Sequence, residues 1–167
     1  MGRDLHIPII FRVLHILLRD EFLQLWLRLE EKFTFEWMNT KLDDPDAWVP
    51  KFSELTCKDK NLIYYSPKCV DEFVTFLTLM NTRHKNLNHV IAEKKFLNLL
   101  VKSLRNFVHK MEELGCLMVA LSQKYSSVAN GACYMREVLE EWSQDVYFIR
   151  LLEEHGEPKI GTIFSYL

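Results

Sequence analysis

Histidines and carboxylates are the side chains best suited to acid–base catalysis or metal binding, and they come closest together at His109, Glu112 and Glu113. Residues three and four apart share one face of a helix, so this group fits a surface ion pair at least as well as a general base. His84 and His89 are five residues apart and would point in different directions on a helix. We therefore interpret both as surface or capping histidines rather than metal ligands.

Three aspartates at Asp43, Asp44 and Asp46 resemble a short divalent-metal motif, but they stand where a helix is expected to end, so we interpret them as a turn. The five glycines are too scattered for a phosphate-binding loop. The sequence contains neither H-E-x-x-H nor E-x-x-H. No serine or cysteine has a local signature of the base and orienting group that a nucleophile needs. The sequence therefore predicts no metal, no cofactor and no enzyme.

Four cysteines, Cys57, Cys69, Cys116 and Cys133, form no C-x-x-C pair. Their spacings match no zinc or disulfide framework. We expect free and mostly buried thiols, which fit a reducing compartment.

The composition is that of a folded chain, because 49% of the residues are apolar and 13% are aromatic. The 21 basic and 23 acidic side chains are interspersed, so no block of like charge suits nucleic acid or an anionic membrane. The apolar segment 7–18 is too short to span a bilayer and lacks the order of a signal peptide. We expect a soluble intracellular chain that reaches membranes only through partners.

Five glycines and five prolines in 167 residues imply few turns and long elements, which are usually helices because strands average about five to six residues. The pattern is helical over 9–42, with a break near Asp20. One apolar stripe on this segment comprises Phe22, Trp26, Leu29, Phe33 and Trp37. Because Trp26, Trp37 and Trp142 fall on such stripes, we expect them in the core.

Residues 43–66 are predicted to form an irregular linker. We expect Trp48 in this linker to be a packing peg, a side chain that packs on the neighbouring helices. A second helix is expected from Ser66-Pro67 to about Asn88, with Ser66 as its N-cap. Its apolar face comprises Phe73, Phe76, Leu77 and Met80.

The clearest periodicity follows, in alternating steps of three and four. It comprises Leu97, Leu100, Leu104, Phe107, Met111, Leu114, Met118, Leu121, Tyr125 and Val128. If this segment divides into two helices, we expect the break at Gly115 and the stretch 122–127. A last helix is expected over 129–154, with an inner face of Val138, Trp142, Val146, Ile149 and Leu152. The sequence thus predicts an all-α fold of about four to six helices within 1–155, and a loop or frayed tail at 156–167.

Four blocks stand in order along the chain, at residues 22–33, 69–87, 93–100 and 134–148. Together they resemble the Rad-interactor/Tip family of vesicle tethers. Residues 22–33 resemble its Trp-Leu-x-x-Glu-x-x-Phe helix, and a tryptophan loop follows. Residues 69–87 end like the family segment in a Lys-Asn-Leu run, and residues 93–100 and 134–148 resemble two later helices. The signature positions are Trp26, Glu30, Phe33, Trp48, Phe73, Arg83, Lys85, Asn86, Leu87, Trp142 and Asp145.

The resemblance implies an elongated helical-bundle segment of the exocyst-like (CATCHR) tether type. It also implies a non-catalytic subunit of the NRZ (Dsl) complex, which acts in Golgi-to-endoplasmic-reticulum retrograde transport, with a cell-cycle checkpoint connection. The implied partners are other tether subunits and reticulum SNARE proteins, at the cytosolic face of the endoplasmic reticulum. The match lacks the family's N-terminal coiled coil and long C-terminal half and fades near His155. We therefore expect a fragment, a truncated product or a divergent short relative.

Three residues at a predicted helix end, Arg83, Lys85 and Asn86, are candidate binding anchors. A simpler interpretation has Arg83 and Lys85 interacting with the last carbonyls of that helix. A free-standing helical adaptor, such as a checkpoint scaffold, is the alternative function. A helical enzyme or ligand carrier is disfavoured because the Leu97–Val128 seam has no charged inward position. A segment of a longer rod should expose contiguous apolar strips, which are unusual in a monomer.

Overall fold

The computed structural model describes residues 9–51, 66–85, 87, 89–117 and 123–153. Within these ranges the chain is helical and has no strand, which confirms the all-α prediction. The helices are α1 (Ile9–Leu17), α2 (Asp20–Leu42), α3 (Lys68–His84), α4 (Val90–Cys116), α5 (Gln123–Ser143) and α6 (Val146–Glu153).

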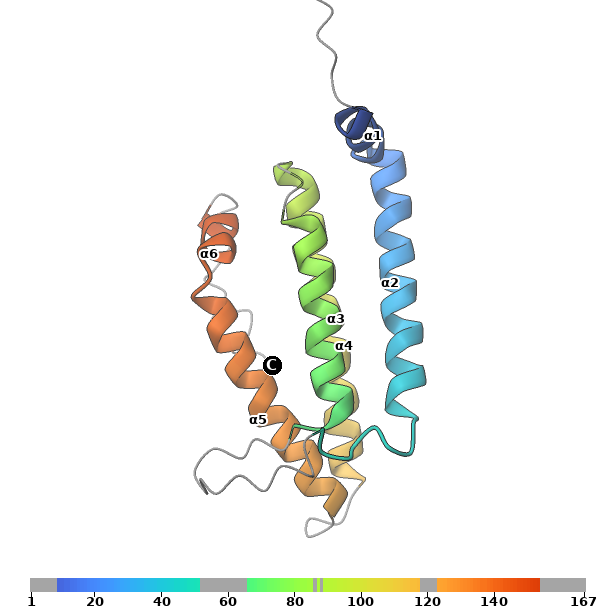
Figure 1. Ribbon diagram of the computed structural model, residues 1–167, viewed down its shortest axis with the longest axis vertical. Helices are drawn as coiled ribbons and strands as arrows, with labels where there is room; N and C mark the ends of the chain where they lie inside the picture. Colours follow the sequence, from blue (N-terminus) through green and yellow to red (C-terminus); the bar gives the residue numbers. More distant parts are fainter. Residues whose placement is uncertain (1–8, 52–65, 86, 88, 118–122, 154–167) are drawn as a thin grey trace, which may run out of the picture.

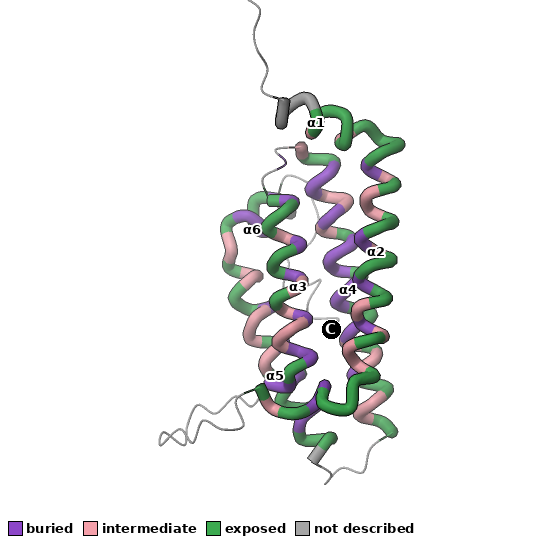
Figure 2. The backbone as a smooth tube through the Cα atoms, turned by 45° about the vertical axis from the view of Figure 1, so that its right-hand side comes forward, coloured by how far each residue is buried: buried purple, intermediate pink, exposed green. Residues whose placement is uncertain are grey.

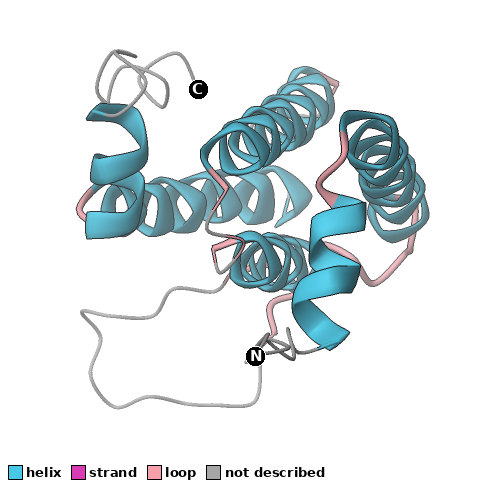
Figure 3. Ribbon diagram, turned by 90° about the horizontal axis from the view of Figure 1, so that it is seen from above, coloured by secondary structure: helices cyan, strands magenta, loops and turns pink. Residues whose placement is uncertain are grey.

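The long helices α2, α3 and α4 run side by side, and α5 is inclined to them (Figure 1). Seen from above, α5 lies across the other long helices rather than parallel to them (Figure 3). The short helices α1 and α6 lie toward the same end of the bundle (Figure 1). The central helix is α4, which packs against α2, α3, α5 and α6. Buried residues follow the sides of the long helices that face one another (Figure 2).

The predicted break near Asp20 is confirmed. Arg19, with extended backbone angles, separates α1 from α2. The acidic residues Asp20 and Glu21 then occupy the first turn of α2, where the helix dipole favours negative charge. The expected turn after α2 is confirmed too, because the Asp46 N–H donates to Asp44 Oδ1 at 2.9 Å.

The start of α3 differs from the prediction by one residue. Pro67, not Ser66, is the N-cap, and no side chain caps the helix. Backbone bonds from Lys68 N to Val49 O and from Cys69 N to Ala47 O instead tie this start to the preceding loop. The same loop buries Trp48 in the core, as expected of a packing peg.

The long seam does divide between two helices, because α4 ends at Cys116 and α5 begins at Gln123. Gly115 and most of the stretch 122–127 nevertheless lie within these helices, and α5 begins six residues before the expected 129. On α4 the seam buries Leu100, Leu104, Phe107 and Met111. Val128 on α5 is buried as well, whereas Tyr125 is exposed. Met118 and Leu121 lie outside the described residues.

The single last helix that we expected is wrong, because α5 ends at Ser143 and α6 begins at Val146. The Asp145 carboxylate explains the break, since its Oδ1 accepts the N–H of Tyr147 at 2.8 Å. The inner face is also shifted. Val146 and Ile149 are exposed, and the buried residues of α6 are Tyr147, Phe148 and Leu151. The side chain of Leu152 and the predicted tail at 156–167 lie outside the described residues, so the domain division stays a prediction.

The apolar stripe of α2 is only partly buried. Trp26 and Trp37 pack against the core, but Phe22, Leu29 and Phe33 are exposed. The face that α2 turns inward is rotated from this stripe and comprises Leu23, Glu30, Thr34 and Met38. Thr34 fits there because its hydroxyl donates to the Glu30 carbonyl at 2.7 Å.

Candidate interaction surfaces

Three signature residues, two from α2 and one from α3, form one hydrogen-bonded group. Glu30 on α2 accepts a bond from Trp26 Nε1 at 3.1 Å through one carboxylate oxygen. Its other oxygen accepts from Arg83 Nη2 on α3, also at 3.1 Å. The Glu30 side chain is only 11% exposed, so these two donors replace much of its water. The group fixes α3 against α2.

His84 lies beside this group and is buried in the core. Its ring stacks on Phe96 with centroids 3.4 Å apart and meets the edge of Trp26 at 5.7 Å. Burial, with a smaller effect from the Arg83 charge, lowers the pKa of His84 to about 3. Its Nε2 has no hydrogen-bond partner among the described residues. His84 is therefore a neutral core residue, not the surface or capping residue that we expected. His89 does cap α4, since its Nδ1 accepts the Ala92 N–H.

A second signature pair joins the end of α3 to the start of α6. Lys85 Nζ lies 3.2 Å from Asp145 Oδ2 and 5.1 Å from the ring centre of Tyr147. The N–H of Tyr147 and, to a smaller degree, the Lys85 ammonium lower the pKa of Asp145. The charges of Arg83 and Lys85 are thus engaged across elements rather than on the carbonyls that end α3. Asn86, the third candidate anchor, lies outside the described residues.

The other signature residues are mostly core. Phe73 is fully buried and stacks on Phe107 with centroids 3.9 Å apart. Leu87 is buried as well, and Trp142 stacks on Phe148 at 5.8 Å. Phe33 is the exception, because 65% of it is exposed.

One buried carboxylate and its half-exposed basic partner were missed by sequence reasoning. Glu93 on α4 has a side chain only 3% exposed, and Arg150 Nη2 on α6 lies 3.5 Å from its Oε2. Nothing in the apolar periodicity of α4 marks Glu93, which stands outside the Leu97–Val128 seam. The signal was present instead in Arg150, the one basic residue of a short and mostly apolar helix.

The exposed residues of the apolar stripe, together with the neighbouring Leu25, form a first candidate interaction surface. It comprises Phe22, Leu25, Leu29 and Phe33 on the outer side of α2, and we name it the α2 stripe. At 39–65% exposure, its side chains are too open to be core. Residues Val13, Ile16 and Leu17 of the neighbouring α1 are also exposed. Such a run of large apolar side chains fits the strip expected of a rod segment.

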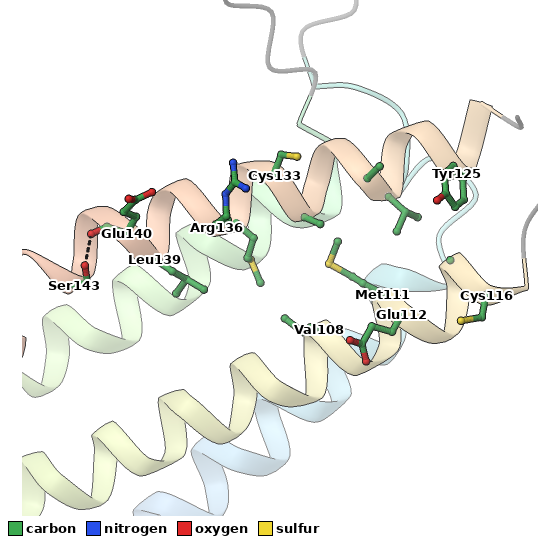
Figure 4. A pocket seen from close by; sticks show the side chains of 15 residues that line it. Val108, Met111, Glu112, Cys116, Tyr125, Cys133, Arg136, Leu139, Glu140 and Ser143 are labelled. Atoms are coloured by element: carbon green, nitrogen blue, oxygen red, sulfur yellow. Dashed lines mark hydrogen bonds between the residues drawn. The ribbon is translucent and has the colours of Figure 1, made fainter. Parts of the chain in front are cut away.

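A groove between α4 and α5 is the second candidate surface, which we name the α4–α5 groove. It has a volume of about 980 Å³. The two helices converge toward Tyr125 and Cys116 and diverge toward Ser143 (Figure 4). Met111 and Leu139 point into the space between them (Figure 4). Glu112 lies on the α4 side, and Arg136 and Glu140 lie on the α5 side.

The described residues hold no cluster of metal-ligating side chains. His109 lies 3.4 Å from Glu113 and 3.8 Å from Glu112 in an exposed group, as expected for a surface ion pair. The thiols described, Cys69, Cys116 and Cys133, are free. The expectation of burial is confirmed for Cys69, and this burial raises the pKa of its thiol to about 12. It is wrong for Cys116 and Cys133, which are exposed. Cys57 lies outside the described residues.

None of the described helices combines the length and the apolar character that crossing a bilayer would need. The described residues form an all-α bundle that exposes two apolar surfaces.

Comparison with known proteins gives the family. The RINT-1/TIP-1 family matches residues 11–160. The chain is 25% identical over 155 residues to the RINT1-like protein MAG2 of Arabidopsis thaliana, an alignment that covers 84% of this chain and 19% of that protein. It is 24% identical over 154 residues to a RINT1-like protein of Drosophila melanogaster, covering 90% and 20% respectively. No solved structure matches significantly.

The chain belongs to the RINT-1/TIP-1 family, because the match covers most of its length. The resemblance recognised from the four sequence blocks is therefore confirmed. Proteins of this family are non-catalytic. The chain spans about one fifth of the length of the curated relatives described above.

Proposed function

We propose that this chain is a non-catalytic segment of a vesicle-tethering complex that acts in Golgi-to-endoplasmic-reticulum retrograde transport through protein–protein contacts. Family membership supports the tethering role. The partners in this proposal are other tether subunits and reticulum SNARE proteins, at the cytosolic face of the endoplasmic reticulum. The fold would be a segment of an exocyst-like (CATCHR) helical rod.

The α2 stripe is the observation that carries this proposal. Burying apolar surface contributes about 25 cal/mol per Å², so open phenylalanines and leucines in one row favour contact with another helix. Phe33 and Leu29 are 65% and 57% exposed, while the opposite face of α2 is already packed on the bundle. The helix can therefore bind on its outer side without losing its place in the fold.

The two intramolecular pairs of signature residues support a stiff segment. Glu30–Arg83 joins α2 to α3, and Lys85–Asp145 joins the end of α3 to the start of α6. A tether holds its partners at a set distance, so helices that are fixed against one another suit that role. In this proposal these signature residues maintain the shape of the segment, and the α2 stripe makes the contact.

The test uses the full chain as bait in a detergent extract of reticulum membranes, with mass spectrometry of the retained proteins. We expect enrichment of tether subunits or reticulum SNAREs. A Leu29→Glu, Phe33→Glu variant should lose them, because it places carboxylates in the stripe at exposed positions that do not hold the fold. Val146→Glu is the matched control, since Val146 is a 77% exposed apolar residue on α6.

If the folded bait retains none of these proteins, the trafficking role is wrong and the free-standing helical adaptor becomes the better explanation. If the stripe variant retains them as well as the unaltered chain does, the binding surface lies elsewhere.

A further inference from the structure

We propose that the α4–α5 groove binds one amphipathic α-helix of a partner protein, laid along α5, with an apolar inner face and basic residues on its edges. This proposal goes beyond the tethering role and does not depend on it. The α2 stripe is a different surface on another helix, so the two can be tested separately.

The dimensions of the groove favour a helix over a small molecule. Its lining on α5 extends from Tyr125 to Ser143, which is about 27 Å at the helical rise of 1.5 Å per residue. A volume of about 980 Å³ over that length gives a mean cross-section of about 36 Å². A helix with its side chains is about 10 Å across, or about 80 Å² in section. The α4 side of the lining is shorter, because it extends only over residues 108–116. The groove therefore accommodates one face of a helix that is held between α4 and α5 at one end and lies along α5 beyond it, whereas small-molecule pockets enclose most of their ligand.

The lining suits a close helical neighbour. Gly115 on α4 and Ala129 and Ala132 on α5 are small, so the side chains of a bound helix can reach between the two helices. Beneath them lie Met111 and Met135, whose flexible thioethers adapt to differently shaped apolar residues. Met111 is drawn pointing into this space in Figure 4.

The charges at the edges decide the chemistry of the bound helix. Two carboxylates, Glu112 and Glu140, line the groove with one guanidinium, Arg136. Within the described ranges, neither Glu140 nor Arg136 has an ion-pair partner. Glu112 has only the imidazole of His109, at 3.8 Å. A carboxylate stands on each side of the groove, and the two together outnumber the single guanidinium, which lies on the same side as Glu140. The complementary edge residues are therefore lysine and arginine.

The probe is a synthetic 18-residue helical peptide with leucines on one face and lysines on both edges. A matched peptide carries glutamates in place of the lysines. Fluorescence anisotropy measures the binding of each labelled peptide to the full chain. We expect the lysine peptide to bind and the glutamate peptide to bind at least tenfold more weakly. Ala132→Trp, which fills the groove, should abolish binding, and Ala132→Glu should weaken it.

Leu29→Glu is the control, because it alters the α2 stripe and leaves the groove intact; circular dichroism verifies the fold of each variant. Glu140→Lys should weaken the binding of the lysine peptide and strengthen the binding of the glutamate peptide. Equal binding of the two peptides, no binding of either, or full binding to folded Ala132→Trp would overturn the proposal. Light scattering tests whether a second copy of the chain occupies the groove instead. If the unaltered chain is a dimer and Ala132→Trp converts it to a monomer, the proposal of a partner helix is overturned.

Discussion

Arg83 Nη2 on α3 lies 3.1 Å from Glu30 Oε2 on α2, although 53 residues separate the two in the sequence. The same carboxylate accepts the indole N–H of Trp26. The two residues are therefore coupled through the fold, and the consequence of removing one of them depends on the other.

Arg83→Ala should lower the free energy of unfolding by about 1–2 kcal/mol, because it leaves a nearly buried carboxylate with one donor fewer. The exposure of the arginine keeps the effect at the lower end of the range for buried groups. Urea unfolding measures it. Lys32→Ala is the control, since the Lys32–Glu36 pair is exposed and its loss should change stability by less than about 0.5 kcal/mol. Equal losses in the two variants would contradict the coupling. In a Glu30→Gln background, Arg83→Ala should lower the free energy of unfolding by less than it does in the unaltered chain.

The free energy of unfolding should decrease as the pH is lowered, because of His84. Its pKa is about 3 in the folded chain against 6.5 as its ordinary value, so the unfolded chain binds a proton that the folded chain does not. The His84 contribution is complete above pH 6.5 and decreases as pH falls toward 3. Between about pH 6.5 and pH 4.5 the loss is about 2–3 kcal/mol. His84→Leu, measured by urea unfolding across that interval, should show a flatter pH dependence than the unaltered chain. Parallel curves would show that His84 is not the titrating group.

Two helical glycines should respond in opposite directions to alanine. A Cβ at Gly131 on α5 would lie 2.8 Å from Val70 Cγ2 on α3, so Gly131→Ala should reduce stability by about 1–3 kcal/mol. A Cβ at Gly115 would meet nothing closer than Val128 Cγ1 at 4.0 Å. Gly115→Ala should therefore stabilise the chain by up to about 1 kcal/mol through helix propensity. Thermal unfolding of both variants checks the sign, and destabilisation by both would be unexpected.

Asp145→Ala should loosen α6 with a loss of about 0.5–2 kcal/mol, because Asp145 caps that helix at the Tyr147 N–H. Amide hydrogen exchange should rise in 146–153 and stay unchanged in α2. Asp145→Asn is the informative companion, since asparagine keeps the capping oxygen and removes the charge that faces Lys85. If the Asn and Ala variants are equally affected, the ion pair matters more than the cap.

The helices were predictable because their signals are local. The acidic first turn of α2 and the aspartates that end this helix each mark a boundary by chain chemistry alone. The stretch 122–127 did not, because most of it belongs to α5. The split between α5 and α6 was harder, because an apolar pattern runs across it and the decisive signal is one capping side chain, Asp145.

Which face of a helix is buried could not be predicted from α2 alone. Its apolar residues cover a wide arc, and the neighbours select Leu23, Thr34 and Met38 rather than Phe22, Leu29 and Phe33. The groove likewise depends on the angle between α4 and α5, which no single helix encodes. The buried place of His84 was also missed, since the rings of Phe96 and Trp26 that surround it come from other helices.

The shared location of α1 and α6 at one end of the bundle has a mechanical consequence (Figure 1). Tension applied between these two helices would not stretch the bundle along its length. It would separate the outer helices from α4 starting at that end. Contacts such as Glu93–Arg150 are then loaded first, and the backbone bonds between residues 47–49 and the start of α3 are loaded last. Contacts loaded one after another yield at lower force than contacts loaded together. The segment would therefore stay stiff along its length and open from this end under such tension.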